Sequence, residues 1–333
     1  MGFVATFTFA CNLRTQTKYH PLAESNRIKS NQIISRLGLG LESGKRLAAA
    51  GAEVVLTTRT AAKGVKAVQD VQQYLSERGI VNNKVLALTL DLCDFDSIKA
   101  FPAALEKALD KHPVDVLMNN AGVMALQSRE LTKDGYERTF QTNHLGHFIL
   151  TSKLAPQLAK DARIINVSSE AWQFASKGLE LDNLNAEREF GPWSSYGTSK
   201  LANILFTKEL QERATAAGKS WTVTALHPGA VATDLGRYLV GEAKWNDMKE
   251  NGMKLQDKLL FVPLSKFTKT VEDGASTQIY LASDGSVGTS ANAGGKYFMD
   301  CKAKDLKSSA IDMDKAKALW TISEELGGVK FDL

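Results

Sequence analysis

The sequence predicts a single-domain α/β fold, a doubly wound parallel sheet with helices on both faces. Two observations carry this prediction: from residue 38 onward apolar strand-like runs alternate with amphipathic helical patterns, and no proline- or glycine-rich linker divides the alternation. The composition agrees, because 44% of the 333 residues are hydrophobic, which is enough for one large core. We therefore expect one continuous domain over residues 38–300.

The expected strands are short runs of β-branched and aliphatic residues that end in polar or turn-forming residues. In chain order they cover residues 53–59, 84–91, 114–122, 162–169, 221–229 and 294–300. A first strand is harder to assign, because "ESNRIKSNQ" (24–32) is too polar for the centre of a sheet. As an alternative, "FVATFTFACN" (3–12) supplies that strand and residues 13–36 are looped out.

Between the strands, apolar residues recur at helical spacing. Helices are expected over residues 40–50, 63–78, 95–111, 132–159, 195–216 and 271–283. The stretch 234–270 breaks the alternation and is expected to extend over one edge of the domain. Residues 301–333 form a tail packed on the domain, with a helix over 314–326. This helix is expected to bury three apolar residues, Leu319, Trp320 and Ile322.

The charge of the chain is concentrated at its N-terminus. Residues 1–37 hold five of the 41 basic residues but only one of the 37 acidic ones, so the remaining chain balances at 36 of each sign. Because residues 38–333 have no net charge, they provide no basic surface for a nucleic-acid backbone, and nucleic acid is not an expected partner. The basic segment is atypical, and three interpretations stay open: a transit peptide, a disordered extension, or an error of gene prediction.

Cysteine usage and hydropathy bear on the location of the protein. Cys11, Cys93 and Cys301 are odd in number and far apart, which indicates neither a disulfide framework nor a zinc site. An intracellular reducing compartment is expected: the cytoplasm, or a plastid or mitochondrion if residues 1–37 are a transit peptide. No apolar run reaches the length of a transmembrane helix, although "LLFVPL" (259–264) offers a contact with a membrane surface or a cap for a pocket. The oligomeric state is left open.

The stretch "SSYGTSKLAN" (194–203) places Tyr196 and Lys200 four residues apart at the start of a helical pattern. Residues four apart share one face of a helix, so the phenol and the ammonium can point into the same space. A nearby cation lowers the pKa of a phenol toward the range where it exchanges protons at neutral pH. The same spacing arises by chance on many helices, so the pair alone does not establish a function.

The ends of the expected strands carry small and polar residues. In open α/β sheets, ligands bind in the crevice beyond the carboxyl ends of the strands. Here "NNAG", "VSS" and "HPGAVATD" follow three strands, and Arg59 and Asp91 close two others. Small residues let a flat ligand approach the backbone, and the polar ones supply hydrogen bonds, so a ligand site is expected at this edge.

Seven motifs stand in the order typical of one protein family: "GLG" (38–40), Asp91, "NNAG" (119–122), "NHLGH" (143–147), "INVSS" (165–169), "YGTSK" (196–200) and "HPG" (227–229). Over residues 38–300 the chain resembles the short-chain dehydrogenase/reductase family. Its "NHLGHF" and "NVSSEAW" segments resemble the retinol dehydrogenase-like branch, which includes relatives of protochlorophyllide reductase and the WW-domain oxidoreductase. The resemblance implies a Rossmann-type fold and hydride transfer between NADP(H) and a hydrophobic alcohol or carbonyl substrate.

The resemblance also implies a catalytic tetrad of Asn143, Ser169, Tyr196 and Lys200. Tyr196 would exchange a proton with the substrate oxygen, and Lys200 would lower the pKa of Tyr196 and hold the nicotinamide ribose. Ser169 would hydrogen-bond the substrate oxygen, with Ser168 as the alternative because neighbouring strand residues face opposite ways. Asn143 would support a water that relays protons through Lys200.

A set of cofactor-binding residues along the strand ends follows from the same resemblance. It comprises Gly38, Gly40, Arg59, Asp91, Leu92, Asn120, Ala121, Gly122, Tyr196, Lys200, Pro228, Gly229, Val231 and Thr233. Folds that select NAD usually place an acid after the second strand, whereas "TTRT" offers Arg59, which can pair with the 2′-phosphate of NADP. NADP(H) is therefore expected rather than NAD(H).

The glycine loop departs from the family pattern T-G-x-x-x-G-x-G. In the aligned segment "IISRLGLG" (33–40), Gly38 and Gly40 are present, but Ile33 and Ile34 replace the threonine and the first glycine. A β-branched residue in a tight turn predicts steric hindrance at the cofactor phosphates. The alternative function is accordingly a catalytically impaired binding protein with the same fold.

Three further patterns have more than one interpretation. His144 and His147 stand three apart on a helix, but a third metal ligand is missing, so packing or hydrogen bonding is expected and metal is not. Trp172 and Trp193 lie in the long segment before Tyr196, where they either line a substrate pocket or pack a surface loop. Extended epimerases and dehydratases share the Y-x-x-x-K spacing, but "NNAG" argues against that branch.

Overall fold

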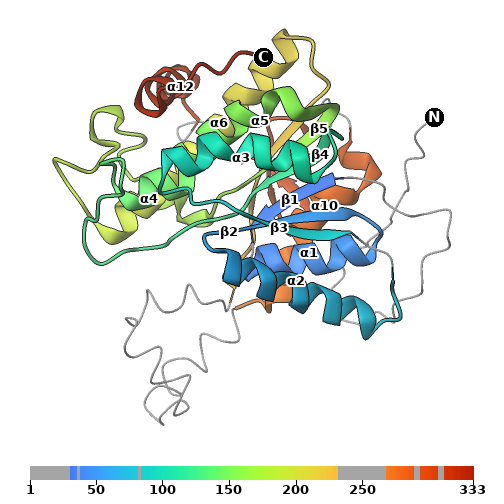
Figure 1. The fold of residues 1–333 in the computed structure, drawn as a ribbon. Helices are drawn as coiled ribbons and strands as arrows, with labels where there is room; N and C mark the ends of the chain where they lie inside the picture. Colours follow the sequence, from blue (N-terminus) through green and yellow to red (C-terminus); the bar gives the residue numbers. More distant parts are fainter. Residues whose placement is uncertain (1–30, 36–37, 82–83, 232–267, 289–292, 307–310) are drawn as a thin grey trace, which may run out of the picture.

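The structure is a computed structural model that describes residues 31–35, 38–81, 84–231, 268–288, 293–306 and 311–333. In these ranges the chain forms an eight-stranded sheet with the order β3-β2-β1-β4-β5-β6-β7-β8. Neighbouring strands are parallel except for the last pair, β7 and β8. The order reverses between β1 and β4, and in open α/β sheets ligands bind beyond the carboxyl ends of the strands at such a point. The predicted α/β fold is confirmed (Figure 1).

The strands are Asn31–Ser35 (β1), Glu53–Thr58 (β2), Val85–Thr89 (β3), Val114–Asn119 (β4), Leu158–Val167 (β5), Thr222–His227 (β6), Tyr297–Met299 (β7) and Lys302–Lys304 (β8). β2, β4 and β6 are buried along most of their length, as expected of strands covered on both faces. The antiparallel edge strand β8 was not predicted, because its three residues are exposed and carry no apolar signal.

The main helices are Leu39–Ala49 (α1), Ala61–Ser76 (α2), Phe95–Ala108 (α3), Arg138–Phe140 (α4), Gly146–Leu154 (α5), Pro192–Ala216 (α6), Val271–Ser283 (α10) and Met313–Gly327 (α12). α1, α2 and α10 lie on one face of the sheet, and α3, α5 and α6 lie on the other (Figure 1). Threonine caps fix two helix starts, because Thr60 and Thr270 each accept a backbone N–H from the first turn. Within the described part of the chain, no helix is both long enough and apolar enough to cross a bilayer.

The first strand corrects the sequence analysis. β1 takes in Asn31 and Gln32 from the segment judged too polar, and it pairs with β2 along its whole length and with β4. The sheet therefore begins before residue 38, and Ile33 and Ile34 lie in a strand rather than in a glycine turn. Pairing between two apolar neighbours stabilises this strand, an effect that strand propensity alone does not capture. The alternative strand over residues 3–12 lies outside the described residues.

The expected helix over residues 132–159 is wrong at both ends. Helical structure starts at Arg138, where the Glu137 carboxylate accepts two backbone N–H groups and caps the turn. Residues 141–145 form a π-helical turn, and β5 begins as early as Leu158. The helix gives way to the 3₁₀ turn Ala155–Gln157 at Pro156, because proline does not continue a helix. Most of the expected excursion over 234–270, including "LLFVPL", lies outside the described residues.

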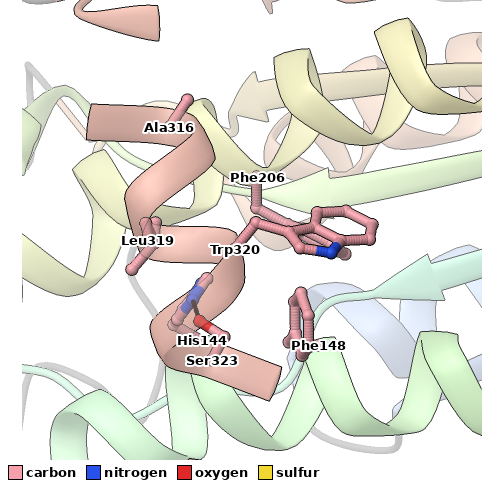
Figure 2. A pocket seen from close by; sticks show the side chains of 7 residues that line it. All are labelled: His144, Phe148, Phe206, Ala316, Leu319, Trp320 and Ser323. Carbon is pink, nitrogen blue, oxygen red and sulfur yellow. Dashed lines mark hydrogen bonds between the residues drawn. The ribbon is translucent and has the colours of Figure 1, made fainter. Parts of the chain in front are cut away.

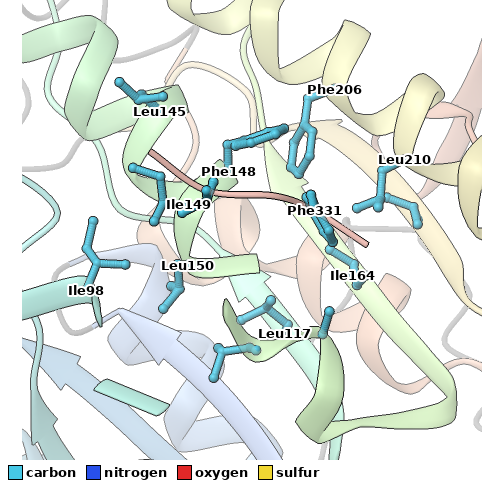
Figure 3. Close-up of a cluster of buried hydrophobic side chains, with 14 of the residues drawn as sticks. Ile98, Leu117, Leu145, Phe148, Ile149, Leu150, Ile164, Phe206, Leu210 and Phe331 are labelled. Atoms are coloured by element: carbon cyan, nitrogen blue, oxygen red, sulfur yellow. The ribbon is translucent and has the colours of Figure 1, made fainter. Parts of the chain in front are cut away.

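Figure 3 shows the core between the sheet and the helices α3, α5 and α6. Phe331, beyond the last helix, packs its ring against Phe148 and Trp320, with centroid distances of 5.5 Å and 4.7 Å, and these two rings also contact each other at 5.0 Å. Leu319 and Trp320 are buried as predicted, whereas Ile322 is only partly buried. Leu319, Trp320 and Phe331 of the C-terminal tail therefore form part of this core.

The C-terminal end of α12 offers a local test of backbone strain. Gly328 has φ 56° and ψ 40°, the left-handed region, and an added Cβ would meet nothing within 4 Å. We expect Gly328→Ala to lower the free energy of unfolding by about 1 kcal/mol, and Gly328→Asn by less, because asparagine tolerates this conformation. Urea unfolding of the three proteins measures the difference. Equal stability of wild type and Gly328→Ala would contradict the assigned conformation.

Candidate active site

The predicted cofactor residues lie along one edge of the sheet, because parallel strands end on the same side. In order of the strands from β3 to β6, the residues at this edge are Asp91 and Leu92, Arg59, Gly38 and Gly40, Asn120, Ala121 and Gly122, Ser169, and Pro228, Gly229 and Val231. Asn143, Tyr196 and Lys200 approach the same edge from helices. Thr233 lies outside the described residues.

Tyr196 and Lys200 lie one turn apart on α6, and both side chains are buried, with Tyr196 7% and Lys200 3% exposed. The helix begins at Pro192, whose fixed backbone angle suits the first turn. Lys200 Nζ lies 5.6 Å from the centroid of the Tyr196 ring and donates a hydrogen bond to Val167 O at 3.0 Å. The pair therefore faces the carboxyl end of β5.

Burial of this pair reverses the expected pKa shift. Loss of solvent raises the pKa of Tyr196 to about 12, although a hydrogen bond with Ser169 acts in the opposite direction. Loss of solvent also lowers the pKa of Lys200 to about 8, so this ammonium loses its charge just above neutral pH. The expectation that Lys200 brings the pKa of Tyr196 toward neutrality is wrong for this structure. Tyr196 is a protonated phenol at pH 7.

The two neighbouring serines have different partners. Ser168 Oγ donates a hydrogen bond to Lys200 O at 2.7 Å, which ties β5 to α6. Ser169 caps the short 3₁₀ turn Glu170–Phe174 by accepting a backbone N–H at 3.1 Å, and its hydroxyl also hydrogen-bonds with the Tyr196 phenol. The structure brings Ser169, and not Ser168, to Tyr196.

A glycine makes the contact between Ser169 and Tyr196 possible. An added Cβ on Gly197 would lie 2.7 Å from Ala171 O and 2.8 Å from Ala175 N. A larger residue would therefore push the turn after Ser169 away from α6. The sequence Tyr-Gly in "YGTSK" thus provides the phenol and also allows the Ser169 hydroxyl to approach it.

Asn143 holds the segment after β4 against α6. It is fully buried in the π-helical turn Gln141–Leu145, a kind of irregularity that is frequent at functional sites. Its amide nitrogen donates to Val123 O and to Ser199 Oγ, each at 2.9 Å, and its Oδ1 accepts from Val123 N at 2.8 Å. These bonds fix the loop that begins with "NNAG".

Gly122 lies where this loop passes Lys200. An added Cβ there would be 3.1 Å from Asn143 Oδ1 and 3.6 Å from Lys200 Nζ, so the glycine keeps open the space in front of the ammonium. The carbonyl oxygen of Asn143 accepts hydrogen bonds from His147 Nδ1 and Asn203 Nδ2, each at 3.0 Å. The water relay expected at Asn143 stays a prediction.

A pocket of about 210 Å³ opens at the carboxyl ends of β2 and β3. Its lining residues are Arg59, Asp91, Cys93, Leu131, Thr132 and Arg138. Arg59 and Asp91 were predicted from the sequence, but Arg138 was missed. Arg138 stands at the start of α4, far from any strand end in sequence, and "YERTF" matches no motif, so only the fold brings the two arginines to one pocket.

The connection between β1 and α1 is short. β1 ends at Ser35 and α1 begins at Leu39, so only residues 36–38 join them. Gly38 is the N-cap, with φ 55°, and Gly40 lies in the first turn of the helix, where backbone N–H groups favour an anion.

Both histidines of "NHLGH" take part in packing and hydrogen bonding. Figure 2 shows His144 beneath α12, where its Nε2 lies 3.1 Å from Ser323 Oγ, and its Nδ1 lies 3.3 Å from Asn203 Oδ1. Burial lowers the pKa of His144 to about 3 and that of His147 to about 4, so both are neutral at pH 7. Among the described residues, no three potential ligands are close enough to hold a metal ion.

Exposed aromatic rings lie beside Tyr196. Trp193 is 39% exposed and Phe174 is 53% exposed, with their ring centroids 5.4 Å apart. The Trp193 ring also lies 6.3 Å from that of Tyr196. Trp172, by contrast, is partly buried and packs against the core. We call Trp193 and Phe174 the aromatic rim of the site.

Comparison with known proteins agrees with this arrangement. The family profile described as short chain dehydrogenase matches residues 35–243. Retinol dehydrogenase 14 of Mus musculus is 36% identical over 301 residues, covering 88% of this chain and 83% of that protein. Retinol dehydrogenase 12 of Homo sapiens is 34% identical over 298 residues, covering 89% of this chain and 84% of that protein.

Solved structures give the same result. The crystal structure of an uncharacterised protein from Mycobacterium paratuberculosis has a TM-score of 0.67 and 30% identity, covering 92% of this chain and 96% of that one. A mutant short-chain dehydrogenase/reductase from Serratia marcescens has a TM-score of 0.57 and 25% identity, covering 84% and 97%. The chain therefore belongs to the short-chain dehydrogenase family of oxidoreductases and, within it, is similar to the retinol dehydrogenases.

Proposed function

We propose that this protein transfers a hydride between NADP(H) and a hydrophobic alcohol or carbonyl substrate. The observation that carries the proposal is the buried Tyr196, hydrogen-bonded with Ser169 and one helical turn from Lys200, at the carboxyl edge of the sheet. A hydride that arrives at a carbonyl carbon leaves charge on its oxygen, which requires positioned donors and a proton source. Tyr196 and Ser169 offer both.

The residues present fit a nicotinamide dinucleotide at both ends of this edge. At one end, Arg59 and Arg138 line a pocket and offer guanidinium donors suited to a phosphate. At the other, the missing side chain of Gly122 leaves space in front of Lys200, whose ammonium is suited to the ribose hydroxyls. When bound, the nicotinamide supplies or accepts the hydride. Arg59 and the absence of an acid after β2 favour NADP(H) over NAD(H).

Tyr196 acts as the proton donor in the direction of carbonyl reduction. A phenol with a pKa near 12 stays protonated at pH 7, yet it is acidic enough to protonate an alkoxide. When substrate binds, the Ser169 hydroxyl exchanges its hydrogen bond with the phenol for one that it donates to the same substrate oxygen. In the oxidation direction the phenol must lose its proton first, so alkaline conditions favour that direction.

The aromatic rim supports a hydrophobic substrate. Adjacent exposed aromatic side chains are uncommon on a soluble surface and often mark a binding site. Trp193 and Phe174 lie next to the phenol that would contact the reacting oxygen. The relatives at 36% and 34% identity are retinol dehydrogenases, and a retinoid-like aldehyde or alcohol is the substrate class that we infer.

A cofactor oxidation assay tests this function. Purified protein is incubated with NADPH and a panel of aldehydes and ketones, including all-trans-retinal and straight-chain aldehydes, while loss of cofactor absorbance is followed. We expect turnover with long apolar aldehydes and little with short polar ones. No turnover with any carbonyl, nor with the corresponding alcohols and NADP⁺, would exclude the proposal.

Replacing Ser169 and replacing Ser168 should have different effects. We expect Ser169→Ala to lower the reduction rate by about a hundredfold, because it removes the hydroxyl beside the phenol. Ser168→Ala should instead lower the free energy of unfolding by about 1 kcal/mol, through loss of its hydrogen bond to Lys200 O, and leave the rate nearly unchanged. Turnover assays and urea unfolding of both variants measure these effects. The reverse pattern would assign the reactive position to Ser168.

A second candidate function is a catalytically impaired binding protein of the same fold. The departure from the glycine pattern favours it, because Ile33 and Ile34, which replace the threonine and the first glycine of that pattern, lie in β1 rather than in a turn. Titration of the protein with NADPH, followed by fluorescence, separates the two. Tight binding with turnover supports the enzyme, tight binding without turnover supports the impaired protein, and absence of binding excludes both.

A further inference from the structure

We propose that Asn203 is a positioning residue for the reaction, because its amide joins the π-helical turn of Asn143 to the end of β5 and thereby holds Lys200 at the site. The inference deepens the proposed function and rests on it for the reaction that Lys200 serves. One of the two measurements below needs no turnover, so the inference and the proposed function can fail separately.

Asn203 lies on the face of α6 that carries Lys200, three residues further along the helix, and it is 3% exposed. Its Nδ2 donates two hydrogen bonds, to Asn143 O at 3.0 Å and to Val167 O at 3.2 Å. Lys200 Nζ donates to the same Val167 O at 3.0 Å. The amide therefore ties the π-helical turn to the last residue of β5, whose carbonyl also holds the ammonium.

The orientation of the Asn203 amide follows from its third partner. His144 Nδ1 lies 3.3 Å from Asn203 Oδ1, an oxygen that can only accept, so His144 Nδ1 carries a proton. Burial lowers the pKa of His144 to about 3, so the ring is neutral and its Nε2 accepts the Ser323 hydroxyl at 3.1 Å (Figure 2). With a donor on one side and two carbonyls on the other, the amide has one orientation.

The position requires an amide rather than an apolar side chain. Asn203 stands in a run of α6 whose other members, Leu201, Ala202, Ile204 and Leu205, are apolar and buried. A polar group in such a run costs free energy unless it is hydrogen-bonded. Leucine has a similar size but offers no donor, and aspartate would place an oxygen against two carbonyl oxygens. The hydrogen bonds, and not packing alone, therefore account for the asparagine.

Removal of the amide should change the protonation of Lys200. The Val167 carbonyl divides its acceptor capacity between the ammonium and Asn203 Nδ2. Without the amide, the carbonyl binds the ammonium alone, and a stronger hydrogen bond to the charged form raises the pKa of Lys200 from about 8 toward the ordinary value of 10.5. Two titratable side chains face Lys200, Tyr196 on α6 and His147 on α5. Their pKa values are about 12 and about 4, so neither changes its charge near pH 8.

Steady-state kinetics of the full chain with NADPH and the best aldehyde of the panel test the role in the reaction. We expect Asn203→Leu to lower kcat about tenfold and to leave KM for the aldehyde within about twofold, because a small displacement of a reacting group costs up to about a hundredfold in rate. Asn203→Asp keeps the size and the acceptor for His144 but loses at least one of the two donors. It should also lower kcat, and it serves as the test variant if Asn203→Leu does not fold.

Gln211→Leu is the matched control. Gln211 lies two turns further along α6 and is 8% exposed. Its amide also bonds to backbone, because Nε2 donates to Trp221 O at 3.1 Å and Oε1 accepts from Val223 N at 2.8 Å. The change therefore removes a buried amide from the same helix at a similar cost in stability, but away from Lys200. It should leave kcat within about twofold of wild type and the pKa of Lys200 unchanged.

An NMR titration of the protein labelled with ¹³C at the lysine ε-carbons measures the pKa of Lys200 without turnover. The Lys200 signal is identified as the one that is missing from Lys200→Met. We expect a pKa of about 8 in wild type and in Gln211→Leu, and a higher value in Asn203→Leu.

Two outcomes would overturn the inference: a kcat of Asn203→Leu, or of Asn203→Asp if it replaces that variant, equal to that of Gln211→Leu, or a pKa of Lys200 that does not rise in Asn203→Leu. A higher pKa in Asn203→Leu, in a protein without turnover, would support the hold of Asn203 on Lys200 and count against the proposed enzymatic function. Turnover by wild type, with neither kcat nor this pKa changed in Asn203→Leu, would do the opposite.

Discussion

Tyr196→Phe is expected to lower kcat for carbonyl reduction by roughly 1,000-fold, within the range that general acid catalysis contributes. The change removes only the hydroxyl that the buried site aims at the substrate oxygen, so folding and NADPH affinity should be unaffected. Burial keeps this hydroxyl protonated at pH 7, and no other phenol is hydrogen-bonded with Ser169 in the described residues. Steady-state kinetics with NADPH and the best aldehyde of the panel measure the loss.

Tyr136→Phe is the matched control for that loss. The Tyr136 hydroxyl donates to Leu326 O at 3.0 Å, where the last turn of α12 meets the domain. Its removal is the same chemical change at a structural position, and it should lower stability slightly while leaving kcat within about twofold of wild type. Equal activity of wild type and Tyr196→Phe would remove the acid from the mechanism.

Lys200→Met is expected to abolish activity and, at the same time, to stabilise the fold. The pKa of Lys200 falls from 10.5 to about 8 because the charged side chain is buried without a carboxylate partner among the causes of its shift. That shift corresponds to a penalty on the order of 3 kcal/mol at pH 7, which methionine removes. The Val167 carbonyl keeps a donor in the variant, because Asn203 Nδ2 also lies 3.2 Å from it.

The pH dependence gives the sign of this effect. A base whose pKa is lower in the folded state binds fewer protons there than in the unfolded chain, so stability rises with pH between the two pKa values. The penalty from Lys200 is present in full below pH 8 and disappears as the pH rises toward 10.5. The advantage of Lys200→Met should therefore be largest near pH 7 and shrink toward pH 10.

Urea unfolding at pH 7 and pH 10 measures that difference. Lys208→Met, on the same helix but partly exposed, is the control and should change stability by less than about 0.5 kcal/mol at either pH. A Lys200→Met variant no more stable than wild type at pH 7 would show that the ammonium is stabilised in the fold. In that case Lys200 would not lower the stability of the fold.

The sequence was sufficient to place the proposed site residues at one edge of the sheet, because its signals are local. The prediction of the Tyr196 and Lys200 pair needs only helical spacing, and that of the strand-end residues needs only the rule that parallel strands end on the same side. Errors in the predicted ends of helices and strands therefore do not change either prediction. The choice between Ser168 and Ser169 needed the structure, which gives the Ser168 hydroxyl to Lys200 O and the Ser169 hydroxyl to the phenol.

What sequence reasoning missed depends on tertiary context. The polar start of β1 is stabilised by pairing with β2 and β4. These strands lie too far along the chain for a local sequence pattern to reveal the pairing. Arg138 reaches the pocket of Arg59 only through the fold. The pKa of Tyr196 was expected to fall because spacing reveals the neighbouring cation, but spacing does not reveal the burial that raises it.

Transfer of isotope from cofactor to product is the direct test of hydride transfer by this protein. NADPH that carries deuterium at both C4 positions is incubated with the protein and all-trans-retinal or a straight-chain aldehyde, and the alcohol is analysed by mass spectrometry. We expect wild type to form alcohol with one deuterium on the carbinol carbon, and Tyr196→Phe to lose this product. Tight NADPH binding with no deuterated alcohol from any aldehyde or ketone of the panel would contradict it.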